Sequence, residues 1–143
     1  MTDAIPQPQS RPIELSLPLP KAIHTTAQIH LTRLATCTMV FLATSTVGDT
    51  SASGTTQPMG SFVYAMPDRT SPRSTISTTL YRTASSEEYA TRIAKILARR
   101  MGVPVYVGCS IDPNALGLMA EEEMEGVKRI VDVVMARWEK ADK

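Results

Sequence analysis

Few side chains in this chain could do chemistry beyond hydroxyls and carboxylates: two histidines and two cysteines. His24 and His30 are six residues apart, on different predicted elements and with no carboxylate nearby in sequence, so they lack the arrangement of a zinc site. Cys37 and Cys109 are far apart, and neither belongs to a Cys-x-x-Cys motif. We expect two reduced, buried thiols, without the neighbouring cation that a nucleophilic thiolate needs.

The glycine-rich and serine-rich segments match no nucleotide-binding or hydrolase motif. Gly48, Gly54 and Gly60 are six apart, which fits neither the dinucleotide fingerprint nor the phosphate-binding loop. No histidine follows Ser51 to act as its base. The glutamates of 121–125 begin a predicted helix, where carboxylates favour the positive end of the dipole. We therefore predict no catalytic, cofactor-binding or metal-binding residue, and a protein that is not an enzyme.

Length and charge limit the class of protein. At 143 residues the chain has the usual size of one domain and is long enough to bury a hydrophobic core. Its formal net charge of +1 gives no general attraction to nucleic acid or to an acidic membrane surface. No apolar run is long enough for a signal peptide or a membrane span. We expect a protein of the cytoplasm or nucleus that binds neither nucleic acid nor membrane.

Proline and small polar residues mark the segments that we expect to be flexible. Five of the ten prolines fall in the first twenty residues, so residues 1–22 are predicted to be a flexible tail with at most an edge strand at 13–17. Segment 47–60 is rich in Ser, Thr and Gly, and segment 67–74 is polar; both are predicted to be flexible loops. The rest forms a single domain over 23–140.

Apolar periodicity predicts the strands of that domain. Residues 27–32 and 103–111 alternate between apolar and other side chains, which is typical of a strand with one buried face. Residues 38–44 and 61–66 are apolar at successive positions, as in strands that are covered on both faces. Residues 75–81 are rich in β-branched residues.

Capping signals and spacing predict two helices. Ser85 and Glu88 are three residues apart and predict a capping box at the start of the first helix, which ends at Gly102. The second helix begins near Met119 or Ala120. Its predicted apolar stripe consists of Met124, Val127, Ile130, Val131, Val134 and Trp138.

These elements indicate an α+β fold: a mostly antiparallel sheet of about six strands with two helices packed on one face. Two helices cover one face of such a sheet, whereas the strands at 38–44 and 61–66 offer apolar side chains on both. The other face is therefore available for dimerisation, and a partner protein is its natural cover.

Segments along most of the chain carry a resemblance to one family. They are IHLTRL at 29–34, TMVFL at 38–42, TISTTL at 75–80, ATRIAKILARR at 90–100 with VYV at 105–107, and Glu123-Met124 in the closing helix. In their order and pattern, from about residue 24 to 135, they resemble proteasome assembly chaperone four. The loops at 48–60 and 68–74 are longer than in the family's animal members, and a proline-rich N-terminus is not one of its hallmarks.

The resemblance implies a function in 20S core particle assembly. A member of this family pairs with a related subunit, assembly chaperone three, through sheet faces turned away from the helices. The pair binds the α5 subunit during α-ring assembly and leaves before the particle matures. The same face would permit a homodimer in the absence of that partner.

The resemblance also implies an interface on this chain. It gives the odd-numbered side chains of 103–111 to the helices and turns Tyr106 toward the partner, together with one face of each early strand. For that face we assign His30, Val40, Leu42 and Val63. Which parity of each early strand faces the partner is left open.

A second function fits the same fold. Small adaptors of the roadblock or longin type also dimerise through a sheet and scaffold trafficking or signalling complexes. The copurified partner separates the two hypotheses, since α-subunits without mature β-subunits indicate the chaperone, whereas GTPases or coat proteins indicate the adaptor.

Overall fold

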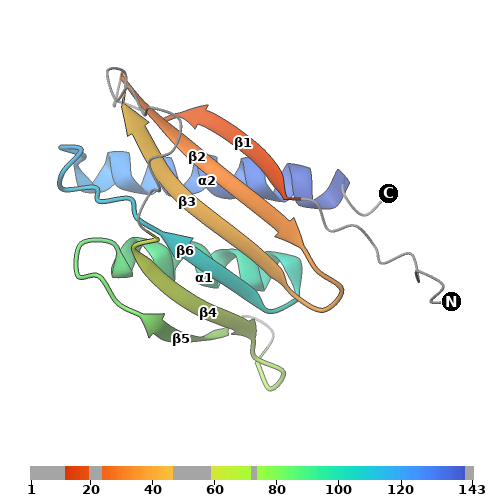
Figure 1. Ribbon diagram of the computed structural model, residues 1–143. Coiled ribbons are helices and arrows are strands. Elements are labelled where there is room, and N and C mark those ends of the chain that lie inside the picture. The colour runs from red at the N-terminus through yellow and green to blue at the C-terminus, as the bar shows by residue number, and fades with distance from the viewer. Residues whose placement is uncertain (1–11, 20–23, 47–58, 72–73, 141–143) are drawn as a thin grey trace, which may run out of the picture.

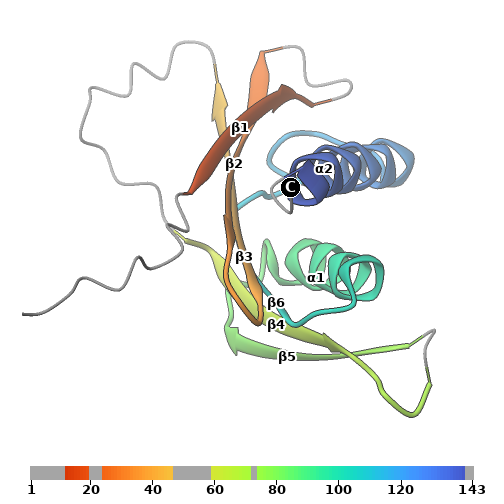
Figure 2. The ribbon, with the colours of Figure 1, turned by 90° about the vertical axis from the view of Figure 1, so that its right-hand side faces the viewer.

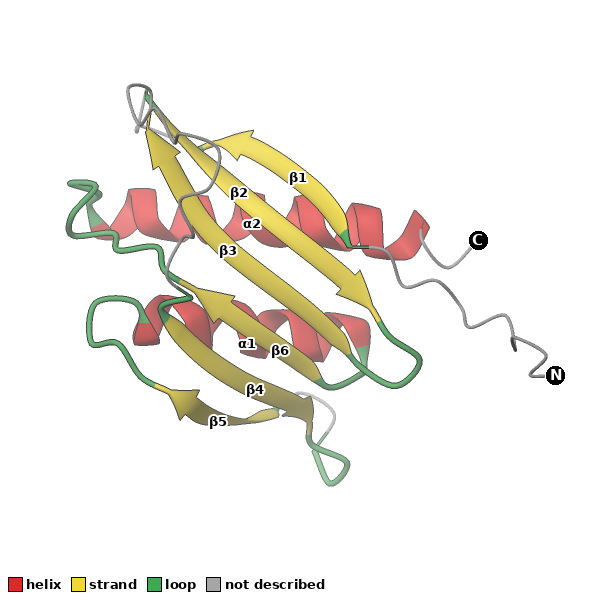
Figure 3. Ribbon diagram, in the orientation of Figure 1, coloured by secondary structure: helices red, strands yellow, loops and turns green. Residues whose placement is uncertain are grey.

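The computed structural model describes residues 12–19, 24–46, 59–71 and 74–140 (Figure 1). The elements, in chain order, are β1 (Ile13–Pro18), β2 (Thr25–Arg33), β3 (Thr38–Thr46), β4 (Ser61–Pro67), β5 (Thr75–Tyr81), α1 (Glu87–Met101), β6 (Val105–Cys109) and α2 (Ala120–Lys140). Figure 3 shows the strands as one layer with the helices behind it.

The strands form a single six-stranded sheet in the order β1-β2-β3-β6-β4-β5. Every neighbouring pair is antiparallel except β3 and β6, which run parallel. Both helices lie on one side of the sheet (Figure 2), with α1 packed on β4, β5 and β6 and α2 against β2. The predicted α+β class, the mostly antiparallel sheet and the placing of both helices on one face are confirmed.

The first strand belongs to the sheet and its core. β1 pairs with β2 along its whole length, from Ile13 opposite Leu31 to Pro18 opposite Thr26. Leu17 and Leu19 are buried in the core, so the assignment of residues 1–22 to a tail was wrong for this part, whereas the edge strand at 13–17 is confirmed. The rest of the tail, at 1–11 and 20–22, lies outside the described residues, as does most of the 47–60 loop.

The capping box predicted for α1 is not formed. The N-cap residue is Ser86, and its side chain makes no capping hydrogen bond. The Ser86 hydroxyl lies 2.9 Å from the hydroxyl of Ser61 on β4, which also donates to the Thr83 carbonyl at 3.0 Å. The Ser86 side chain therefore joins the helix start to the sheet. The end of α1 is as predicted, because Gly102 has φ 70° and donates to the Ala98 carbonyl at 2.9 Å.

α2 begins at Ala120, where the Met119 N–H donates to the Glu122 carboxylate at 3.0 Å. The residues of its predicted stripe are buried or half-buried except Met124, which is 52% exposed. At the other end the indole N–H of Trp138 donates to Thr38 Oγ1 at 3.0 Å. This bond fixes the C-terminal part of α2 to the start of β3.

Candidate partner-binding face

Strand alternation divides the sheet side chains between a face under the helices and a face turned away from them, here called the open face. The helix-side residues of β2, β3, β4 and β6 have side chains buried completely or nearly so. They are Ala27, Ile29, Leu31, Val40, Leu42, Val63, Ala65, Val105, Val107 and Cys109. The odd-numbered side chains of β6 therefore face the helices as predicted, and the remaining parity of each strand forms the open face.

The assigned interface residues fall on both sides of the sheet. His30 and Tyr106 lie on the open face, as expected. Val40, Leu42 and Val63 have 0%, 2% and 0% of their surface exposed and belong to the core under the helices. Their assignment to a partner surface is corrected, since their neighbours in sequence occupy the open face instead.

An aromatic row, made of Phe41, Phe62, Tyr64 and Tyr106, crosses the centre of the open face. The rings of Phe41 and Phe62 are stacked with centroids 6.1 Å apart and planes 3° apart. Phe62 stacks on Tyr106 at 5.7 Å, and Tyr106 meets Tyr64 at 4.7 Å with a tilt of 54°. Rings at these distances attract one another beyond their burial. All four side chains are half-buried, so one surface of the row is accessible to solvent.

Gly108 allows the aromatic row to close over β6. It lies between Phe41 of β3 and Phe62 of β4 in the sheet register. A Cβ at this position would lie 2.6 Å from Cδ1 of Phe41, closer than side-chain carbons approach. The two phenylalanine rings therefore meet in the space that a side chain on β6 would take, while Tyr106, two residues earlier, fills its own place in the row.

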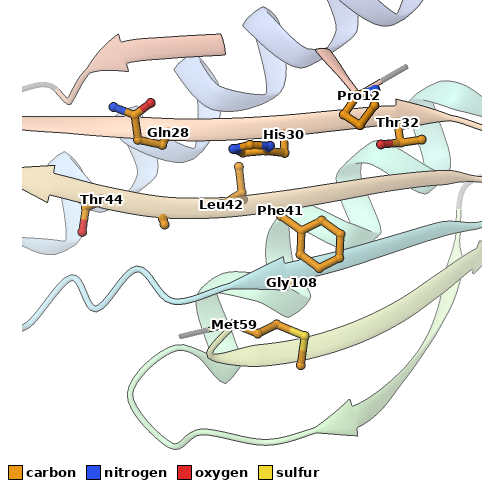
Figure 4. Close-up of a pocket in the computed structure, with 10 residues that line it drawn as sticks. Pro12, Gln28, His30, Thr32, Phe41, Leu42, Thr44, Met59 and Gly108 are labelled. Carbon is orange, nitrogen blue, oxygen red and sulfur yellow. The ribbon is translucent and has the colours of Figure 1, made fainter. Parts of the chain in front are cut away.

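A hollow of about 530 Å³ opens on the same face next to Phe41 (Figure 4). Gln28, His30 and Thr32 of β2 line one side, and Phe41, Met59 and Gly108 line the other. Pro12, Ala43 and Thr44 complete it, with Leu42 bordering it although that residue is almost fully buried. The hollow shares Phe41 with the aromatic row and is also lined by Gly108, over which the row closes, so the two form one continuous surface.

The open face is more polar toward β1. Glu14 and Ser16 are exposed there, and Glu14 lies directly opposite His30 in the register. The Gln28 amide nitrogen donates to Ser45 Oγ at 3.2 Å. An apolar, aromatic centre beside a polar flank is the composition of many protein–protein interfaces.

The other side chains that could take part in chemistry are buried or are not grouped with one another. Burial raises the pKa of the Cys109 thiol to about 12, which keeps it protonated and unreactive at neutral pH. Burial also raises the pKa of the Tyr89 hydroxyl above its ordinary range, and that hydroxyl has no hydrogen-bond partner among the described residues. Among the residues that the structure describes, no three His, Cys, Asp or Glu side chains are grouped as metal ligands. Neither described helix is long and apolar enough to cross a membrane.

Sequence reasoning missed most of the aromatic row, although its signal is present in the alternation. One face of β3 and β4 carries Met39 and Phe41 from β3 and Phe62 and Tyr64 from β4, whereas the other face carries valine, leucine and alanine. Compact aliphatic residues suit the narrow space under two helices, whereas aromatic residues and methionine are enriched at interfaces. On each strand, that difference in size identifies the side chains that lie on the open face.

The fold and much of the sequence match proteins of proteasome assembly. A family model described as proteasome assembly chaperone 4 matches residues 26–111, more than half of the chain. Among solved structures, the chain is similar in fold to one from "Crystal Structure of a Novel Chaperone Complex for Yeast 20S Proteasome Assembly". The TM-score is 0.62 with 16% sequence identity, covering 88% of this chain and 95% of that chain. No curated protein sequence matches significantly. The family match contains β2, β3, β4 and β6, the strands that build the open face, and the chain belongs to the proteasome assembly chaperone 4 family.

Proposed function

We propose that this chain is one subunit of a heterodimeric assembly chaperone and that its open face binds a sister subunit similar to assembly chaperone three. The observation that carries the proposal is the aromatic row, which is half-buried in the chain alone and lies on the side of the sheet away from both described helices. Covering these rings with a second sheet would remove their remaining apolar surface from water, which favours association.

In this proposal the pair then binds the α5 subunit of the 20S core, promotes formation of the α-ring and leaves before the particle matures. Family membership and the fold shared with a yeast 20S assembly chaperone chain support this part. The chemistry required is burial and release of surface rather than bond making, which agrees with the protonated, buried state of Cys109. Such a subunit would work in the cytoplasm or nucleus.

Affinity purification of the tagged chain at its native level, followed by quantitative mass spectrometry, tests the whole proposal. We expect one small sister subunit and 20S α-subunits, with α5 the most enriched, and no mature β-subunits. Recovery of GTPases or coat proteins in their place would favour a roadblock-like or longin-like adaptor and refute the chaperone function.

Purified components test the pairing directly. Native mass spectrometry of the chain with the recovered sister subunit should show a 1:1 complex, and addition of α5 should give a ternary complex. Arg129→Glu serves as the control for the pairing, because Arg129 is exposed on α2, on the helix side of the sheet. If Arg129→Glu abolished the heterodimer and an open-face variant kept it, the interface would lie on the helix side and the proposed pairing through the open face would be refuted.

A further inference from the structure

We propose that the hollow beside Phe41 is a socket for one uncharged aromatic side chain with a hydrogen-bonding tip, a tyrosine or tryptophan, from the sister subunit. This inference rests on the proposed function, because it names the group that fills one part of the proposed interface. Its basis is the size of the hollow, the charge of its lining, the division of that lining into two sides, and its continuity with the aromatic row.

The size of the hollow requires an occupant. A partner sheet that covers the aromatic row also covers Phe41, which the row and the hollow share, and Gly108, which lies beside Phe41 in the register. Without a side chain inserted, part of this open hollow of about 530 Å³ would remain as unfilled space within the interface. Unfilled space between packed surfaces is destabilising roughly in proportion to its volume. One bulky side chain fits this requirement better than the small residues that suffice over a flat sheet.

The lining excludes a charged occupant. None of the ten lining residues is Lys, Arg, Asp or Glu. A charged side chain placed there would lose its hydration and find no opposite charge among these residues. The occupant is therefore neutral.

The two sides of the lining differ in chemistry, which selects an amphipathic ring. Phe41 and Met59 offer an aromatic ring and a thioether on one side (Figure 4). Gln28, His30 and Thr32 offer groups that donate and accept hydrogen bonds on the β2 side. Tyrosine and tryptophan combine a large apolar body with one polar group, and both are enriched at interfaces for this reason.

Filling the socket from within tests the inference. Ala43 lines the hollow and shares the open parity of β3 with Phe41, so Ala43→Phe places a ring where the partner's ring would enter. We expect the Kd for the sister subunit, measured by isothermal titration calorimetry, to rise about tenfold or more, as when a central interface anchor is lost. Ala43→Ser keeps the hollow and should change the Kd by less than about twofold.

A rescue experiment identifies the occupant. Each Tyr and Trp of the sister subunit is replaced in turn by Ala, and each variant is titrated against wild-type chain and against Ala43→Phe. One sister variant should bind wild-type chain weakly but bind Ala43→Phe more tightly than the unmodified sister does. Absence of any such variant refutes the inference, because the added ring would then act without displacing a partner ring.

Two other results also overturn the inference, and they are distinguishable from failure of the proposed function. If Ala43→Phe binds normally while Tyr106→Glu does not, the open face is the interface but the hollow stays empty. If Ala43→Phe lowers the Tm of the isolated chain by several degrees and leaves the Kd unchanged, a segment of the chain itself fills the hollow. If neither variant weakens binding, the open-face interface of the proposed function is what fails.

Discussion

The substitution Gly108→Ala should weaken binding of the sister subunit while leaving the free energy of unfolding almost unchanged. A Cβ at Gly108 would lie 2.6 Å and 2.8 Å from Cδ1 and Cε1 of Phe41 and 3.2 Å from Cγ of Met59. Since non-bonded carbons pack at about 3.5 Å or more, the Phe41 ring has to move by about 1 Å. That shift takes the ring out of its parallel stack with Phe62.

The magnitudes predict a small effect on folding and a large one on binding. Loss of one aromatic stack costs about 0.5–1.5 kcal/mol, and replacement of Gly by Ala returns about 0.4–1 kcal/mol by restricting the unfolded chain. The free energy of unfolding should therefore change by less than about 1 kcal/mol. Because the displaced ring lies at the centre of the open face, the Kd for the sister subunit should rise about tenfold, or about 1.4 kcal/mol.

Urea unfolding followed by far-UV circular dichroism measures the first quantity, and calorimetric titration with the sister subunit measures the second. Gly126→Ala is the matched control, because Gly126 is a buried glycine of α2 on the helix side, where the added Cβ would meet the Tyr89 hydroxyl at 3.2 Å. It should leave the Kd unchanged. Normal binding by Gly108→Ala, with its near-UV dichroism showing a displaced aromatic row, would refute the role of these rings.

Three further predictions follow from the site and its supports. Tyr106→Glu, at the junction of two ring contacts, should abolish the heterodimer by light scattering while the helical dichroism of the isolated chain is retained; an unchanged dimer mass would contradict it. Trp138→Phe and Thr38→Val each remove one partner of a single hydrogen bond, so each should lower the free energy of unfolding by about 1 kcal/mol, and the double variant should fall short of their sum. The pKa of Cys109 is raised in the folded chain, so the protonated thiol contributes fully to the free energy of unfolding below about pH 9. That contribution is lost as pH rises toward 12, by up to about 1.4 kcal/mol per pH unit. Cys109→Ala should flatten this alkaline decline in urea unfolding, and an identical pH profile would contradict the assignment.

The sequence predicted those features that depend on local pattern. Alternation along 103–111 gives the helix-facing side of β6, and Gly102 gives the end of α1. Features that depend on distant partners were missed or misassigned. Ser86 has the sequence of a helix cap, but its hydroxyl meets Ser61, 25 positions earlier, which no local pattern contains.

The parity of β3 and β4 was undetermined for a similar reason. Both parities of each strand are largely apolar, so hydrophobicity alone does not say which one the helices cover. The register resolves it, since Ile29 pairs with Leu42 and Val63 with Val107, and all four are buried together. Val40, Leu42 and Val63 were assigned to the partner because burial under helices and burial under a partner both favour apolar residues.

The position of β6 in the sheet makes the open face a product of late folding. β6 is the last strand to be synthesised, yet it lies between β3 and β4, supplies Tyr106 to the row and places Gly108 between Phe41 and Phe62. Until it has left the ribosome, β1-β2-β3 and β4-β5 are two separate pieces of sheet, each with an unpaired edge. Phe41 and Phe62 then lie on different pieces. A partner that recognises their stacked rings would therefore bind only a chain in which β6 has already joined the two pieces of the sheet.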